Sequence, residues 1–260
     1  MNKYSHAVRH SIPSVIGILR TFFQRPAFGV RLFQRRLRYF LSRELVDPLI
    51  TPEGFSIDTP DALIAYWSMF VERELYDARW VEPIRNATRP LIVDVGANAG
   101  VFSLFAHCLN PTAEIIAFEP LPVMQVRLAA LQKQTGINLM IHGKAVSKSV
   151  GEALFESPHG YDGISRFASV GQSGANTFRV ETTTLDSVLS NRKIALMKVD
   201  VEGFECDVIE GGRRCLAQTD FLIMEAQDPE HLANITRALG DGWMRKKLGA
   251  GDYLFVRERR

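Results

Sequence analysis

The chain reads Val93-Asp94-Val95-Gly96-Ala97-Asn98-Ala99-Gly100 between a short apolar run and a second apolar run that starts at Val101. This order predicts a buried strand, a tight turn and a helix. Glycine in such a turn lets a ligand approach the backbone, and the N-terminus of the helix offers unpaired N–H groups. The segment therefore predicts a ligand site at the end of a strand.

The pattern of this segment recurs along the rest of the chain. Five short apolar runs predict buried strands at 91–95, 113–118, 138–142, 195–199 and 221–225. Helix patterns lie between them at 99–108, 123–135, 204–211 and 230–239. Two alternating runs, 151–156 and 177–183, predict a β insertion, and 243–247 with 252–256 predict a terminal hairpin. Strands that alternate with helices indicate an α/β fold with a parallel, doubly wound sheet.

The N-terminal part follows a different pattern. Apolar residues at helical spacing predict amphipathic helices over 12–23 and 33–41, and Thr59-Pro60 predicts the start of a helix over 60–70. Pro48, Pro52 and Gly54 interrupt the pattern, so we place a boundary near residue 50. The expected organisation is a basic helical arm, 1–50, and one further domain, 51–260.

Charge separates the same two parts. The 260 residues carry 31 Lys and Arg against 29 Asp and Glu, a net charge of +2. Residues 1–45 hold nine basic residues and one acid, so they carry +8, and the remainder carries −6. The average composition excludes a mainly disordered chain, a collagen-like repeat and a membrane bundle. Three cysteines without a C-x-x-C pair favour a reducing compartment, and we expect a cytoplasmic protein.

The turn after residue 95 admits several ligands. A dinucleotide fingerprint would need glycine where Asn98 and Val101 stand, and the Gly-Lys-Ser/Thr of a phosphate-binding loop is missing. What remains is Asp-x-Gly-x-Asn-x-Gly, in which the acid can meet a cationic amino acid rather than a diphosphate.

Two further acidic motifs stand at predicted strand ends. Phe118-Glu119-Pro120 follows the second strand, where a carboxylate can accept both hydroxyls of a ribose. Lys198-Val199-Asp200-Val201-Glu202-Gly203-Phe204-Glu205 follows the fourth strand. Three carboxylates at a strand end are costly to bury unless they face a cleft, so we expect a reacting group to enter there.

Together these motifs resemble the FkbM family of S-adenosylmethionine-dependent methyltransferases. The matching motifs, in order, are Asp94 to Gly100, Ala117 to Pro120, Thr184-Leu185-Asp186, Lys198 to Glu205 and Ile223-Met224-Glu225. The resemblance covers about residues 70 to 228. It implies a class I, Rossmann-like methyltransferase fold with a C-terminal antiparallel hairpin. The turn Leu131 to Gly136 departs from the family's Asn-rich pattern, so the substrate rim is expected to differ.

The resemblance also implies roles for single residues. The methionine side of S-adenosylmethionine would lie against Asp94, Gly96, Ala97, Asn98 and Gly100. Glu119 would hold the ribose, and Asp200 would lie near the methyl sulfonium. An alcohol acceptor needs a base or a metal to remove its proton. Glu202 is the first candidate for the base, Asp200 the second and His159 the third. A divalent metal stays open, but no ligand pattern supports one.

Each of these residues also has a structural interpretation. Gly96 and Gly100 could serve only the turn, and Glu119 could cap the helix that begins near Pro120. Glu202 and Glu205 could favour a helix dipole without any catalysis. Asp228 with Glu225 could bind a metal, but such a pair more often caps a helix.

The expected activity is methyl transfer to a hydroxyl of a small molecule or a glycan, which the resemblance suggests is a sugar in a glycan, a glycolipid or a natural product. An inactive cofactor-binding or membrane-tethered scaffold stays open. A nucleic-acid methyltransferase using the basic arm is disfavoured, because Asp200-Val201-Glu202-Gly203 stands where an Asn/Asp-Pro-Pro-Tyr/Phe motif is expected. A short-chain dehydrogenase is disfavoured because Tyr-x-x-x-Lys is missing.

The basic arm has three interpretations. It could be a solvated face on packed helices, a peripheral contact of residues 1–45 with an anionic membrane, or a nucleic-acid site. Arginine opposite phenylalanine and leucine is typical of interfacial helices, whereas no RNA-binding module is recognisable.

Overall fold

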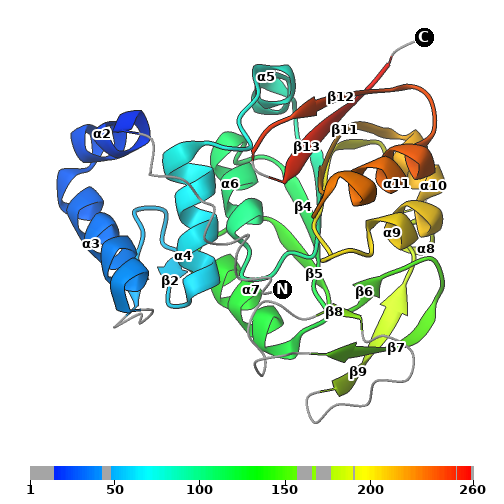
Figure 1. Ribbon diagram of the computed structural model, residues 1–260, viewed down its shortest axis with the longest axis horizontal. Helices are drawn as coiled ribbons and strands as arrows, with labels where there is room; N and C mark the ends of the chain where they lie inside the picture. The colour runs from blue at the N-terminus through cyan, green and yellow to red at the C-terminus, as the bar shows by residue number, and fades with distance from the viewer. Residues whose placement is uncertain are drawn as a thin grey trace. The chain divides into compact units, whose positions relative to one another are not determined.

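The computed structural model describes residues 15–42, 48–156, 166–167, 177–189, 191–249 and 251–258. The chain divides into two compact units, 1–76 and 77–260 (Figure 1). The boundary predicted near residue 50 lies inside the first unit, and the division into an arm and a methyltransferase domain stays a prediction.

The first unit is mainly helical. Its elements are α2 (Val15–Gln24), α3 (Pro26–Ser42), β1 (Leu49–Ile50), β2 (Ser56–Ile57), α4 (Pro60–Tyr66) and the π-helix η1 (Trp67–Glu72). The Thr59 hydroxyl accepts the N–H of Ala62 and caps α4, as the sequence predicts. Phe28 of α3 packs edge-on against Tyr66, and the Arg36 guanidinium lies 4.9 Å from the ring centre of Trp67. The arm helices are therefore packed on the segment that follows them.

The second unit is built on a seven-stranded sheet. Its strands are β3 (Leu91–Val95), β4 (Glu114–Phe118), β5 (Leu139–His142), β10 (Ile194–Val199), β11 (Thr219–Glu225), β12 (Trp243–Lys247) and β13 (Asp252–Arg257). Their order is β12-β13-β11-β10-β3-β4-β5. The five strands from β5 to β11 are parallel, whereas β13 is antiparallel to both of its neighbours. This is the class I methyltransferase fold with the C-terminal antiparallel hairpin that the sequence predicts.

Helices cover both faces of this sheet. They are α5 (Ala78–Asn86), α6 (Val101–Leu109), α7 (Pro122–Thr135), α8 (Leu185–Leu189), α9 (Glu205–Gly211), α10 (Arg213–Ala217) and α11 (Pro229–Leu239). Figure 1 shows α6 and α7 on one side and α8 to α11 on the other. The sequence did not predict α5, because Pro83 stands inside it, yet it buries Trp80, Val81 and Ile84.

The predicted β insertion is confirmed as a separate sheet. Its strands are β6 (Ala145–Val146), β7 (Gly151–Glu156), β8 (Arg166–Phe167) and β9 (Thr177–Thr183), in the order β6-β9-β7-β8. Ala145, Phe155 and Val180 form its small core. Because β6 follows β5 closely along the chain, the insertion begins beside the edge where the parallel strands end.

Backbone hydrogen bonds join the turns at that edge. The N–H groups of Gly96 and Ala97 both donate to the Phe118 carbonyl, at 3.0 and 3.1 Å, and the Asp200 N–H donates to the Val95 carbonyl at 3.0 Å. Three segments that are distant in the sequence are thus held together where β3, β4 and β10 end. In the described part of the chain, no helix is both long and apolar enough to cross a membrane.

Candidate functional site

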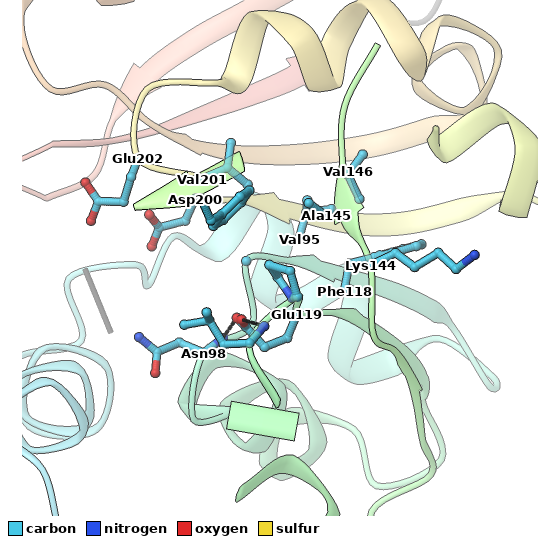
Figure 2. A pocket seen from close by; sticks show the side chains of 14 residues that line it. Val95, Asn98, Phe118, Glu119, Lys144, Ala145, Val146, Asp200, Val201 and Glu202 are labelled. Carbon is cyan, nitrogen blue, oxygen red and sulfur yellow. Dashed lines mark hydrogen bonds between the residues drawn. The ribbon is translucent and has the colours of Figure 1, made fainter. Parts of the chain in front are cut away.

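A cavity opens where the parallel strands of the second unit end. Its walls are formed by Val95, Gly96, Asn98, Phe118, Glu119, Pro120, Leu121, Lys144, Ala145, Val146, Phe155, Asp200, Val201 and Glu202. Figure 2 shows the carboxylates of Asp200 and Glu202 at one end and Lys144 at the other, with Glu119 between them. Five of the predicted site residues therefore share one cavity: Gly96, Asn98, Glu119, Asp200 and Glu202.

The turn after β3 requires glycine for packing as well as for any ligand. Gly96 has φ +79°, and a Cβ there would overlap the carbonyl oxygen of Asp200. Gly100 has φ +85°, and a Cβ would lie 2.8 Å from a side-chain carbon of Leu128. Both glycines thus have the structural role that the sequence left open. Asn98, with φ +48°, is the polar side chain that this turn contributes to the cavity wall.

Asp94 lies inside β3 and is completely buried. Its Oδ2 accepts the Ser103 hydroxyl at 2.7 Å, whereas within the described structure its Oδ1 has no hydrogen-bond partner. Burial raises the pKa of Asp94, against the opposing effect of Lys198. Asp94 is not part of the cavity wall, and neither are Ala97 and Gly100. Their assignment to the cofactor stays a prediction.

Glu119 follows β4 and is 5% exposed. Its two carboxyl oxygens accept the N–H groups of Asn98, at 2.8 Å, and of Leu121, at 2.9 Å. Burial raises the pKa of Glu119 to about 7, although both N–H donors act to lower it. The carboxyl group therefore supports the turn before α7 and, at the same time, faces the cavity.

An ion pair between a buried lysine and a partly exposed aspartate lies where β10 ends. The Lys198 Nζ lies 2.6 Å from Asp200 Oδ2, and the Lys198 side chain is 6% exposed. Burial lowers the pKa of Lys198, but the carboxylates of Asp200, Asp94 and Asp252 outweigh burial and raise it. For Asp200, burial raises the pKa and Lys198 lowers it further than burial raises it. Both groups are therefore charged at neutral pH.

Two more carboxyl groups accompany Asp200. Glu202 lines the cavity, and Glu225 ends β11. The negative charge of Asp200 and burial raise the pKa of Glu225 to about 10, so Glu225 is protonated at neutral pH and shares a hydrogen bond with Asp200. Oxygens of these three residues lie within 4.8 Å of one another, close enough for a divalent cation. As a metal ligand, Glu225 was expected only together with Asp228, which instead caps α11 by accepting the His231 N–H at 2.7 Å.

Several site residues were not predicted from the sequence. Lys144, Ala145 and Phe155 line the cavity, and only their place after β5 and in the insertion could have indicated it. Gln227 donates its side-chain N–H to Glu202 at 3.2 Å, and nothing in the local sequence indicates that contact.

Two other predicted positions have different outcomes. Asp186, in the Thr-Leu-Asp motif, accepts the N–H groups of Arg214 and Cys215 at 3.2 and 2.9 Å, so it caps α10 outside the cavity. His159, the third candidate for the base, lies outside the described residues.

Comparison with known proteins identifies a family that matches much of the second unit. Residues 94–245 match the family model described as the methyltransferase FkbM domain. A solved precorrin-6y C5,15-methyltransferase from Geobacter metallireducens aligns with a TM-score of 0.43 and 14% identity, over 73% of this chain and 89% of that chain.

Three curated proteins are similar in sequence. The 31-O-demethyl-FK506 methyltransferase FkbM of Streptomyces tacrolimicus is 29% identical, over 65% of this chain and 76% of that protein. The hexuronic acid methyltransferase AglP of Haloferax volcanii is 27% identical, over 57% of this chain and 60% of that protein. The AMB antimetabolite synthetase AmbE of Pseudomonas aeruginosa is 27% identical over 57% of this chain, which spans only 9% of that protein.

Proposed function

The chain belongs to the FkbM methyltransferase family, and from this we propose that it transfers a methyl group from S-adenosylmethionine to a hydroxyl group. The observation that carries the proposal is Glu119, a buried carboxyl group that two backbone N–H groups hold against a cavity at the edge of a parallel sheet. A carboxylate there can accept both hydroxyls of a ribose.

The residues fit the remaining parts of the cofactor. The unpaired Oδ1 of Asp94 is a buried acceptor next to the turn, and Asn98 adds a polar side chain to the cavity wall. Lys144 and Ala145 line the cavity beside Phe118 and Phe155, where a flat base can lie against apolar side chains. We assign the ribose to Glu119, the methionine part to the turn 96–100 and Asp94, and the base to the end near Lys144.

The cofactor supplies an activated methyl group, and the protein aligns it with the acceptor. Methyl transfer is an in-line displacement, so fixed positions and the exclusion of water contribute most of the catalysis. Glu202 faces the cavity beside Asp200, and we propose that it takes the proton of the acceptor hydroxyl. Asp200 is held by Lys198 at 2.6 Å, which makes it the weaker candidate for the base.

A sugar hydroxyl in a glycan, a glycolipid or a natural product is the acceptor that we propose. The hexuronic acid methyltransferase AglP is a relative whose name specifies a sugar acid, and the FK506 methyltransferase FkbM is a relative that acts on a natural product. Acceptor identity needs its own test: incubation with labelled S-adenosylmethionine and a panel of hexuronic acids, neutral sugars and glycolipids.

Titration calorimetry with S-adenosylmethionine tests the cofactor site directly. We expect wild-type binding and at least about a hundredfold weaker binding for Glu119→Ala, because two ribose hydrogen bonds to a buried charge are lost. Glu114→Ala is the matched control, since Glu114 begins the same strand but pairs with Arg192 at 2.7 Å, away from the cavity. A wild-type protein that does not bind the cofactor would contradict the proposal. Binding without turnover on the whole panel would favour an inactive scaffold.

We further propose that the first unit contacts an anionic membrane surface. Residues 15–42 contain six arginines and no acid. Their helices expose Phe23 by 83% and Phe40 by 64%, and within the described structure no other phenylalanine is among the exposed large apolar residues. Leu19, Val30 and Leu37 are exposed as well. Exposed phenylalanine and leucine beside arginine favour a bilayer with anionic headgroups over a nucleic acid, which would leave the apolar side chains without a partner.

Several arginines of the arm contact later residues of the first unit. Arg20 donates to the Val71 carbonyl, Arg25 pairs with Glu53 at 2.7 Å, and Arg36 lies on Trp67. Arg31 and Arg38 are exposed. The proposed contact therefore combines the apolar residues with these two arginines. The other four, including Arg35, which donates to the Pro48 carbonyl at 3.3 Å, join the arm helices to later residues of the first unit.

Sedimentation with vesicles tests this contact. We expect the full chain to sediment with vesicles that contain phosphatidylglycerol and to stay in solution with pure phosphatidylcholine. Phe23→Ser with Phe40→Ser should reduce binding at least about tenfold, since each buried apolar side chain contributes to insertion. Met244→Ser, at a residue that is 50% exposed in the second unit, is the control. Equal loss in both variants, or no binding by the wild type, would contradict the proposal.

A further inference from the structure

The loop that carries Glu202 has a backbone that needs support. Glu202 has φ +55° and Gly203 has φ +103°, so two consecutive residues lie in the left-handed region. Glycine adopts this region readily, whereas a glutamate does so only where its surroundings hold it. The position of the Glu202 carboxylate therefore depends on what fixes residues 201–203.

The buried side chain of Glu205 fixes the main chain of this loop. Its Oε1 accepts the N–H of Val201 at 3.0 Å and lies 3.5 Å from the N–H of Gly203. Glu205 is 1% exposed, so these bonds are shielded from water. Glu205 begins α9, but its carboxylate turns back toward the loop. A favourable interaction with the helix dipole does not account for that geometry.

His231 of α11 holds the second oxygen of Glu205. The His231 Nε2 lies 2.9 Å from Glu205 Oε2, and the imidazole is 13% exposed. The other ring nitrogen, Nδ1, accepts the main-chain N–H of Gln227 at 3.3 Å. A ring that accepts at Nδ1 carries its proton on Nε2, the atom that lies beside Glu205 Oε2.

Gln227 closes the ring of contacts. Its side-chain Nε2 donates to Glu202 Oε2 at 3.2 Å, while its main-chain N–H bonds His231. The ring thus runs from Glu202 through Gln227, His231 and Glu205 back to the loop that carries Glu202. It links the ends of β10 and β11, which are neighbours in the sheet.

We propose that Glu205, His231 and Gln227 are positioning residues that hold the Glu202 carboxylate at the cavity. The proposal rests on the proposed function, in which Glu202 is the base. Glu205 and His231 fix the backbone of the loop, and Gln227 orients the carboxylate itself. None of the three lines the cavity, so they act through Glu202.

The ring is expected to respond to acid. The Glu205 carboxylate raises the pKa of His231, partly against burial, and Asp228 adds to the effect. A second proton on the imidazole must go to Nδ1, which then no longer accepts the Gln227 N–H. Acidification therefore breaks the link between His231 and Gln227 before it breaks the pair with Glu205.

Hydrogen exchange of single amides tests the backbone part of the ring. We expect the amides of Val201 and Gly203 to exchange at least about tenfold faster in Glu205→Gln and in His231→Leu. Asp228→Asn is the matched control, because Asp228 caps the same helix by accepting the main-chain N–H of His231 and is not a member of the ring. Unchanged exchange in the two variants, or equal acceleration in Asp228→Asn, would overturn the proposal.

Gln227→Leu tests the orienting part with kinetics on the best acceptor of the panel. We expect kcat to fall about tenfold and the acidic limb of the pH profile to move to higher pH, with unchanged cofactor affinity and unchanged exchange of Val201. A variant with wild-type kcat and pH profile would overturn the role of Gln227. Full activity of Glu202→Gln would instead contradict the assignment of the base and leave the exchange results standing.

Discussion

The turn after β3 and the loop after β10 are neighbours at one sheet edge, yet the carboxyl groups beside them, the buried Glu119 and the partly exposed Asp200, are stabilised in opposite ways. Beside the first turn, Glu119 is held by two backbone N–H groups, and the pKa of its carboxyl group rises to about 7. In the second, Asp200 is held by the buried ammonium of Lys198, and its pKa falls. Amide donors stabilise a buried carboxylate less than a full charge does.

The difference in pKa indicates different roles for the two carboxyl groups. A carboxyl group with a pKa near neutrality can change its charge when a ligand binds, whereas one paired with lysine keeps its charge. The turn after β3 is therefore suited to a ligand that binds reversibly. The loop after β10 is suited to maintain a permanent negative field at the place where a sulfonium would lie.

Replacing Lys198 should have the largest effect on stability. Lys198→Met leaves the buried Asp94 and the partly exposed Asp200 without a cation, and we expect a loss of about 3–5 kcal/mol in the free energy of unfolding at neutral pH. Denaturant unfolding measures it, with Lys193→Met as the control, because Lys193 is 74% exposed and pairs with Asp220 at the surface.

The pH dependence of this variant provides a second check. In the wild type, the lowered pKa of Asp200 contributes stability that is lost as pH falls through that value. Without Lys198 the carboxyl groups should bind protons on folding, so the variant should become more stable as pH falls. Equal slopes in the two proteins would contradict the role of the lysine.

Disturbing the contact between Gly96 and the Asp200 carbonyl should have the next largest effect on stability. Gly96→Ala places a Cβ against the Asp200 carbonyl at φ +79°, and we expect a loss of about 2–4 kcal/mol. Gly136→Ala is the control: φ is +71°, but no atom lies within 4 Å of the added carbon, so the expected loss is about 1 kcal/mol. A similar loss in both variants would show that the backbone angle alone matters.

Replacing the carboxyl group of Glu225 by an amide should stabilise the protein. Because its pKa is raised to about 10, the folded state must bind a proton that the unfolded chain releases above its ordinary pKa. Glu225→Gln removes this cost, and we expect a gain on the order of 1–2 kcal/mol at neutral pH and a flatter dependence of stability on pH. A loss of stability together with an unchanged slope would show that Glu225 is ionised.

The smallest effect should be the pH dependence of cofactor binding. Ribose hydroxyls donate to an ionised carboxylate, so a group with a pKa of about 7 should weaken binding about tenfold between about pH 8 and about pH 6. Calorimetry at the two pH values measures this change. Glu119→Gln should bind more weakly at the higher pH and show no such dependence, whereas an equally pH-dependent variant would place the titrating group elsewhere.

The sequence predicts the sheet well because its strands are buried on both faces. All five residues of β3 are buried, including Asp94, and the apolar run predicts the strand's exact bounds. The helix α5 could not be predicted from the sequence, because it contains Pro83 and proline is unfavourable inside a helix. Packing stabilises this helix nonetheless. The predicted helix over 60–70 is correct only to Tyr66, where α4 ends, and the π-helix η1 begins at Trp67.

Part of the candidate site was predictable from the sequence, whereas its interactions were not. The motifs identified Asn98, Glu119, Asp200 and Glu202, which all reach the cavity. The proximity of Lys198 to Asp94 was not predictable, because it depends on the register that places the two residues opposite each other on neighbouring strands. The contact of Gln227 with Glu202 depends in the same way on the pairing of β10 with β11.

The close approach of Gly96 to the Asp200 carbonyl has a consequence for the history of such a chain. A descendant that lost catalysis would still need glycine at this position, because the two segments would still have to meet. Persistence of Gly96 among descendants would therefore report an intact scaffold. Replacement of Glu119 or Glu202 beside an unchanged Gly96 would instead mark a lineage in which the chemistry had been abandoned and the architecture retained.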